Sequence, residues 1–115
     1  MVISQVYSIN ADNKPLGPLL KRGAAVSVQI ETLSGTVASV GTFKLQSSNS
    51  QLSWVDENPD GVGTPGLTTT GIFQYGAATG TTPNPGVLKQ AVQVICLTQP
   101  SGGVKVTLYA DGIHE

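Results

Sequence analysis

The sequence predicts an all-β protein: an antiparallel β-sandwich, jelly-roll-like, with little or no helix. Apolar and polar residues alternate in several short runs, the pattern of strands with one buried and one solvated face. Loops rich in Gly and Pro separate these runs, and such loops interrupt regular structure. No segment of ten or more residues shows the 3.6-residue apolar period of a helix,. About six to eight short strands joined in this way are typical of a sandwich or barrel.

One domain is expected over residues 1–115. A chain of 115 residues and 11.8 kDa is long enough for one hydrophobic core,, and no boundary divides it into two viable cores. Three segments are expected to lie outside regular strands because Pro and Gly interrupt them. They are an irregular arm or loop at 10–23 and two long loops at 56–66 and 76–86.

Strand patterns occur along the whole chain. Alternation is imperfect at 2–9, so the inward face of that strand stays open, and it is cleanest at 24–32. The stretch 41–56 predicts a strand around Phe43, a polar turn, and a second short strand that begins at Trp54,.

Three further strands are expected in the second half of the chain. They lie within 67–75, 87–98 and 104–109,. The last two are separated by the turn QPSGG and are therefore predicted to form a hairpin.

The inward faces of these strands define a predicted core of ten side chains. They are Val26, Val28, Ile30, Phe43, Leu45, Trp54, Val92, Val94, Val106 and Leu108. Trp54 has two interpretations. As a core residue between the sheets it would cost about 3–5 kcal/mol to replace with Ala, whereas an exposed Trp on a sandwich can stack on a sugar ring. Aromatic residues are only 5% of the chain, so core filling is the preferred interpretation.

Charge and composition argue against several classes of partner. Charged residues are 11% of the chain, the net charge is −1, and only Lys21 and Arg22 are adjacent basic residues. Without a basic stripe to neutralise phosphates, no nucleic-acid partner is expected. No apolar run approaches the roughly 20 residues of a membrane span, and no cationic apolar leader opens the sequence, so no membrane partner is expected either.

Few side chains could carry catalysis. Cys96 is the only cysteine and lies in an apolar strand pattern, so it is interpreted as a core thiol,; a chain without a disulfide suits folding in a reducing cytosol. His114 is the only histidine, and a flexible position near the end of the sequence suits a catalytic base poorly. We therefore expect no enzyme, no catalytic residue, no cofactor and no metal.

The densest acidic group comprises Asp56, Glu57 and Asp60. An acidic loop that ends in Gly can supply oxygen ligands to calcium, but this spacing does not match a D-x-[DN]-x-[DN]-G loop. A solvated loop is the preferred interpretation. If the protein were an enzyme, these three carboxylates would be its only supportable catalytic residues.

Two segments of the sequence resemble short all-β virion proteins of tailed bacteriophages. The first is GTFKLQSSN, which is followed soon by a tryptophan, and the second, further on, is VQVICLTQPSGGVKVTLYADG. The resemblance covers residues 40–112. The first segment is also similar to galactose-binding-like (discoidin) jelly rolls, but Ser50 and Gln51 replace the usual Asp-Gly turn, and no Arg precedes the last pair of strands.

The phage resemblance implies a structural virion protein, made in the host cytoplasm and located in the virion. The expected role is a capsid decoration or cement protein that binds the shell and self-associates. Its partners would be the major capsid protein or other virion subunits. The alternatives are a tail or head-fibre accessory protein, or a carbohydrate-binding module for host recognition.

The arm at 10–23 suggests how such a protein could assemble. It holds Leu16, Leu19 and Leu20 among prolines and glycines, and exposed apolar groups among polar ones commonly mark contacts between proteins. One interpretation is that these leucines form a protein interface within a homo-oligomer, with a trimer suggested by analogy to virion spikes. The other is that the arm folds across an open end of its own sandwich.

Overall fold

A single bent strand, β2 (Leu16–Thr32), belongs to both layers of the molecule. The computed structural model describes residues 1–35, 37–76 and 89–114, with the backbone alone at 21–24 and 111–114. These residues form seven strands and no helix. The strands make two antiparallel sheets of four strands each, with β2 counted in both. The predicted all-β sandwich is confirmed.

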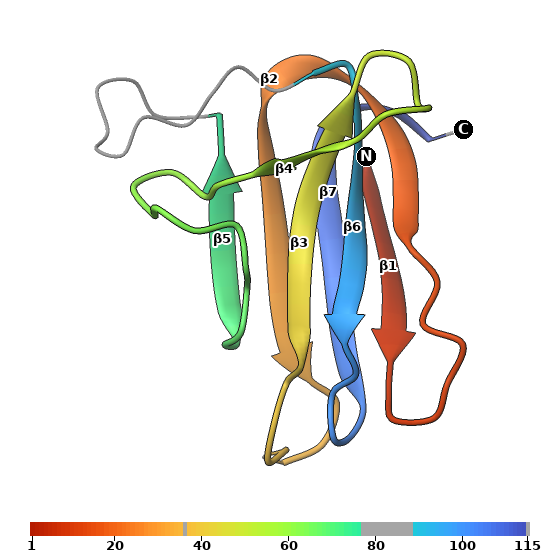
Figure 1. Ribbon diagram of the computed structural model, residues 1–115, viewed down its shortest axis with the longest axis vertical. Helices are drawn as coiled ribbons and strands as arrows, with labels where there is room; N and C mark the ends of the chain where they lie inside the picture. Colours follow the sequence, from red (N-terminus) through yellow and green to blue (C-terminus); the bar gives the residue numbers. More distant parts are fainter. Residues whose placement is uncertain (36, 77–88, 115) are drawn as a thin grey trace.

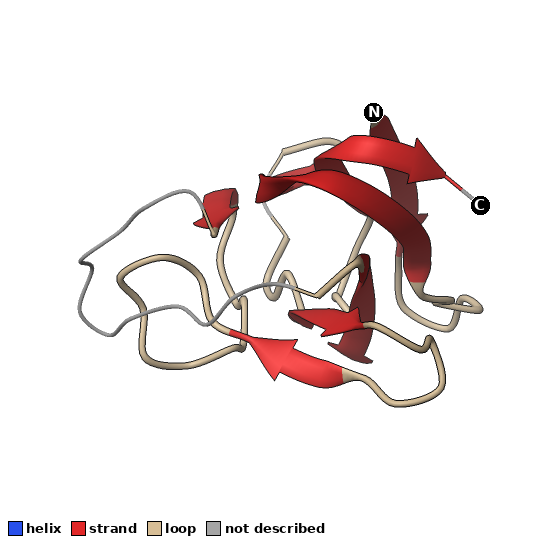
Figure 2. Ribbon diagram, turned by 90° about the horizontal axis from the view of Figure 1, so that it is seen from above, coloured by secondary structure: helices blue, strands red, loops and turns tan. Residues whose placement is uncertain are grey.

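The two layers face each other across the core (Figures 1 and 2). The back layer has the order β5 (Gly71–Tyr75), β2, β7 (Val104–His114), β1 (Val2–Tyr7). The front layer has the order β2, β6 (Ala91–Thr98), β3 (Thr42–Ser48), β4 (Val55–Glu57). The register of β2 against β7 shifts between Lys21 and Val26. Such an irregularity bends a strand, and here it lets β2 pass from the front layer to the back layer.

The core lies between the layers and contains nine of the ten side chains predicted from the sequence. Each of the nine is at most 1% exposed: Val26, Val28, Ile30, Phe43, Leu45, Val92, Val94, Val106 and Leu108. Tyr7 of β1 and Phe43 of β3 join the two layers through an edge-to-face ring contact with centroids 5.1 Å apart, a favoured aromatic geometry. The tenth residue, Trp54, lies outside this core and is described below.

The irregular arm predicted at 10–23 is wrong from Leu16 onward, because β2 begins there. Leu16 and Leu19 lie opposite Val94 and Val92 of β6 and are 4% and 0% exposed, respectively, while Leu20 is partly buried. The interface role expected for Leu16 and Leu19 is therefore wrong. The alternative, that the arm folds across an open end of its own sandwich, holds only in that these leucines are buried in their own core. They are buried there as part of the paired strand β2 and not by folding across an end. A register shift between Leu16 and Leu19 places residues three apart on the same face, which hides the strand from a search for strict alternation.

The hairpin predicted for the last two strands is also wrong. β6 pairs with β2 and β3, whereas β7 pairs with β1 and β2. The turn at 99–103 thus carries the chain from the front layer to the back layer. A local turn signal shows that two strands are consecutive, but their partners are set by the packing of the whole sandwich.

Two loops were expected as well. β4 extends to Glu57, so the first loop begins at 58 rather than 56, and the rest of it carries no strand. Of the segment 76–86, only Gly76 lies within the described residues. Over its described part, the chain has no helix long and apolar enough to span a bilayer.

Candidate functional site

Trp54 directly precedes β4 in the chain. Within β4, Glu57 lies opposite Leu45, and Asp56 lies opposite Gln46. Leu45 is fully buried, so Glu57 takes the inward position and Asp56 faces outward. The prediction of a core Trp54 is wrong: its side chain is partly exposed.

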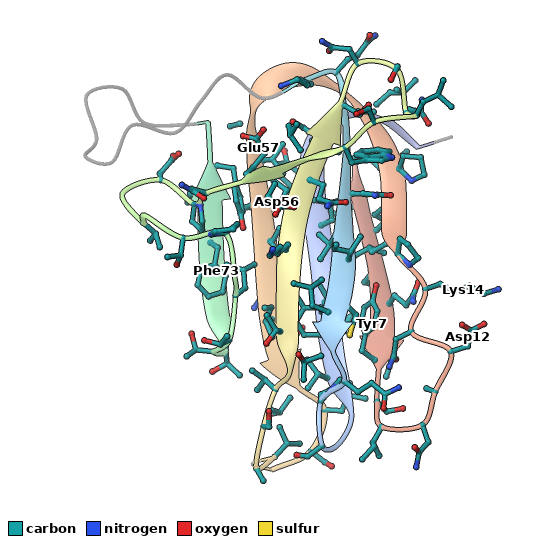
Figure 3. The ribbon with its side chains drawn as sticks, in the orientation of Figure 1. Tyr7, Asp12, Lys14, Asp56, Glu57 and Phe73 are labelled. Atoms are coloured by element: carbon teal, nitrogen blue, oxygen red, sulfur yellow. The ribbon has the colours of Figure 1, made fainter. Side chains whose placement is uncertain are left out.

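A row of polar side chains crosses the outer face of the front layer, and we call it the amide ladder: Lys44, Gln46, Asp56 and Gln93. The Nε2 of Gln93 donates to Oε1 of Gln46 at 3.0 Å, and the Nε2 of Gln46 donates to Oδ1 of Asp56 at 2.9 Å. The Nζ of Lys44 donates to Oδ2 of Asp56 at 3.0 Å. The ladder thus joins β6, β3 and β4. Figure 3 labels Asp56, its member on β4.

The ladder holds its carboxylate in the charged form. Hydrogen bonds from Gln46 and Lys44 lower the pKa of Asp56 below its usual value, because donors and a nearby cation favour the anion. The result is a fixed line of donors and acceptors on the outer face of the front layer, and the partly exposed Trp54 is close to it in the sequence. Such a combination can hydrogen-bond hydroxyl groups while the indole packs against the apolar side of a ring.

The sequence identified only part of this site. Alternation placed Lys44 and Gln46 on a solvated face, but Gln93 lies far along the chain and reaches the ladder only through pairing of β6 with β3. Local patterns carry no signal for that contact.

The three acidic residues singled out in the sequence do not converge. Asp56 belongs to the ladder, whereas Glu57 points inward, is 8% exposed, and accepts a hydrogen bond from Oγ of Ser47 at 2.9 Å. Oδ1 of Asp60 accepts from the backbone N–H of Gly76 at 2.9 Å. No group of three or more His, Cys, Asp or Glu in the described part of the chain could hold a metal ion.

Cys96 and His114 are the two other residues that the sequence analysis considered as reactive groups. Cys96 is half-buried against the core, its thiol donates to the carbonyl of Thr98 at 3.4 Å, and burial raises its pKa. The thiol is therefore held in the protonated, poorly nucleophilic form. The side chain of His114 lies outside the described residues.

The structure contains two buried tyrosines with different hydroxyl environments. The Tyr7 hydroxyl donates to the carbonyl of Lys14 at 2.7 Å, whereas the Tyr75 hydroxyl has no hydrogen-bond partner among the described residues. Burial raises the pKa of Tyr75, and the nearby Glu57 raises it further. The Tyr75 hydroxyl is thus a neutral, buried donor with no acceptor in the described part of the chain.

Removing each of these two hydroxyls should change the free energy of unfolding differently. We expect Tyr75→Phe to leave the free energy of unfolding unchanged or to raise it by up to about 1 kcal/mol, because an unsatisfied buried hydroxyl is costly. Tyr7→Phe should lower it by about 1 kcal/mol, since it removes a satisfied hydrogen bond. Urea denaturation of both variants measures the difference, and equal losses would contradict it.

The outer face of the back layer, which we call the back face, is nearly uncharged. Val2, Val6, Ile72 and Tyr109 are its large apolar side chains, and each is at least 50% exposed. Ser4, Ser27, Gln29, Gln74 and Thr107 fill most of the remaining positions. Its described charges are Glu31 and Lys105, which face each other across β2 and β7.

Comparisons of the chain with protein-family models, with curated proteins and with solved structures gave no match.

Proposed function

We propose that this protein is a structural virion protein of a tailed bacteriophage, most specifically a capsid decoration or cement protein that binds the shell and self-associates. The proposal includes a non-enzymatic role, a location in the virion, and the major capsid protein or other virion subunits as partners. The resemblance of residues 40–112 to such proteins supports it.

The back face is the observation that carries this proposal. Ile72 is 62% exposed and Tyr109 is 50% exposed on a sheet surface made of hydroxyl, amide and apolar groups. Exposed apolar groups among polar ones on a folded domain can mark a contact with another protein, and the centres of such contacts are poor in charge. A sheet surface with these properties suits attachment to the outside of a regular shell.

Ile72 provides a direct test of shell binding. We expect Ile72→Lys to weaken co-sedimentation with capsids of the phage that encodes this protein by about tenfold, because it places a charge in the apolar contact. The matched control is Leu52→Lys, since Leu52 is 92% exposed but lies in the loop between β3 and β4. Equal binding by both variants, or failure of the wild-type protein to co-sediment, would refute the proposal.

A second candidate function rests on a different surface. The partly exposed Trp54, two residues before the ladder residue Asp56 in the chain, favours a carbohydrate-binding module, as on a host-recognition fibre. In a thermal-shift screen against simple sugars, a binding sugar should raise the melting temperature of the wild-type protein. Trp54→Ala should abolish that rise and still fold, because its side chain is outside the core, whereas Leu52→Ala should retain it. A wild-type protein that responds to no sugar removes this candidate.

A further inference from the structure

Strand β1 has one side without a strand partner in the described part of the chain. It pairs with β7 alone and stands at the end of the strand order. The amino group of Met1 donates to the C=O of Ala110 at 2.8 Å, and the C=O of Met1 accepts from the N–H of Ala110 at 3.1 Å. Bonded and non-bonded pairs alternate along antiparallel strands. Ile3, Gln5 and Tyr7 therefore direct their backbone groups toward β7, while those of Val2, Ser4 and Val6 point away from it.

Ser8 is the next residue after Val6 whose backbone N–H and C=O point away from β7, and both groups are hydrogen-bonded to a side chain. The N–H of Ser8 donates to Oδ1 of Asn13 at 3.2 Å, and its C=O accepts from Nδ2 of Asn13 at 2.9 Å. The side-chain amide of Asn13 thus takes the place of a neighbouring strand at Ser8. Among the described residues, the outward backbone groups of Val2, Ser4 and Val6 have no such substitute.

The other sheet margins are protected in ways that β1 is not. β4 is three residues long. At β5, the backbone N–H of Asp60 donates to the carbonyl of Gln74 at 2.7 Å and its carboxylate accepts from Gly76. Edge strands are normally blocked by short length, charge, Pro or a covering segment. β1 (VISQVY) is six residues long and contains neither charge nor Pro.

We propose that β1 pairs antiparallel with β1 of a second copy, about a twofold axis through Ser4. This places Val2 opposite Val6 of the second copy and Ser4 opposite Ser4. Each of these pairs can exchange both backbone hydrogen bonds, and the valine pairs add β-branched contacts across the strands. The occupant is a second copy because the strand is complementary to itself and carries no charge to repel its own image.

The pairing has a consequence for assembly. Joining two four-stranded back layers makes one continuous sheet, so two back faces become a single surface. This deepens the proposed function, on whose self-association it rests, and gives that self-association a structural basis. The same strand contributes to both sides of an isologous contact, which favours a twofold pair as the basic unit over the trimer suggested by analogy.

Ser4 allows a charge-reversal test by analytical ultracentrifugation. Its side chain is exposed, so Ser4→Lys and Ser4→Glu should both fold, as circular dichroism can verify. Each variant alone should sediment as a monomer, because identical charges face each other at the axis. An equimolar mixture should recover the dimer mass of the wild type. Gln74→Lys adds the same charge at the far margin of the same face and should remain dimeric.

The outcomes separate this inference from the proposed function. A monomeric wild type, variants that remain dimeric, or a mixture without recovery overturns the β1 pairing. If such a protein still co-sediments with capsids, shell binding stands without the pairing. If the wild type dimerises through Ser4 but does not co-sediment, the pairing stands and the proposed function fails.

Discussion

Replacing Phe43 with Ala is expected to lower the free energy of unfolding by about 3–5 kcal/mol. Phe43 is fully buried, and its ring joins the two layers by its edge-to-face contact with Tyr7. Truncation removes that contact and leaves a cavity between the sheets, which the surrounding strands can close only in part. Such a loss is a large share of the stability of a typical domain. Urea denaturation followed by circular dichroism measures it.

Leu52→Ala is the control for this experiment. Leu52 is 92% exposed, so its truncation should change the stability by no more than about 0.5 kcal/mol. If Phe43→Ala and Leu52→Ala unfold at the same urea concentration, Phe43 does not occupy the core described here.

Gly41→Ala is expected to cost at least about 3 kcal/mol, by a different mechanism. Gly41 has φ = +82° and lies directly before β3. A Cβ there would overlap the carbonyl oxygen of Thr98 and lie 2.8 Å from the backbone nitrogen of Pro100. Both neighbours are backbone atoms, so relieving the overlap means moving the chain at the end of β6. The cost of the positive φ adds to that of the overlap.

Gly61 separates these two contributions. It has φ = +78°, but a Cβ at Gly61 would meet nothing within 4 Å. Gly61→Ala should therefore cost only the backbone term, about 1–2 kcal/mol. The difference between the two variants in thermal or urea unfolding reports the close approach to Thr98 and Pro100. Equal losses would show that the overlap is relieved without cost.

The candidate surfaces were only partly predictable from the sequence. The alternation in β3 correctly placed Phe43 and Leu45 inward and left Lys44 and Gln46 outward. Trp54 was assigned to the core because of its size and hydrophobicity, whereas it lies directly before β4 with its side chain partly exposed. The ladder contact to Gln93 depends on β6 lying beside β3.

The sequence by itself determined the class of fold and most of the core, because period-two alternation is a local property of an extended chain. Val26, Val28 and Ile30 show this directly: each is at most 1% exposed, as their spacing predicts. What only the tertiary structure decided is which strands are neighbours and in which register. The bulge that buries both Leu16 and Leu19, the separation of β6 from β7, and the open margin of β1 depend on contacts between distant segments. Those contacts are set by how the two layers close over a shared core, and no short window of sequence contains that information.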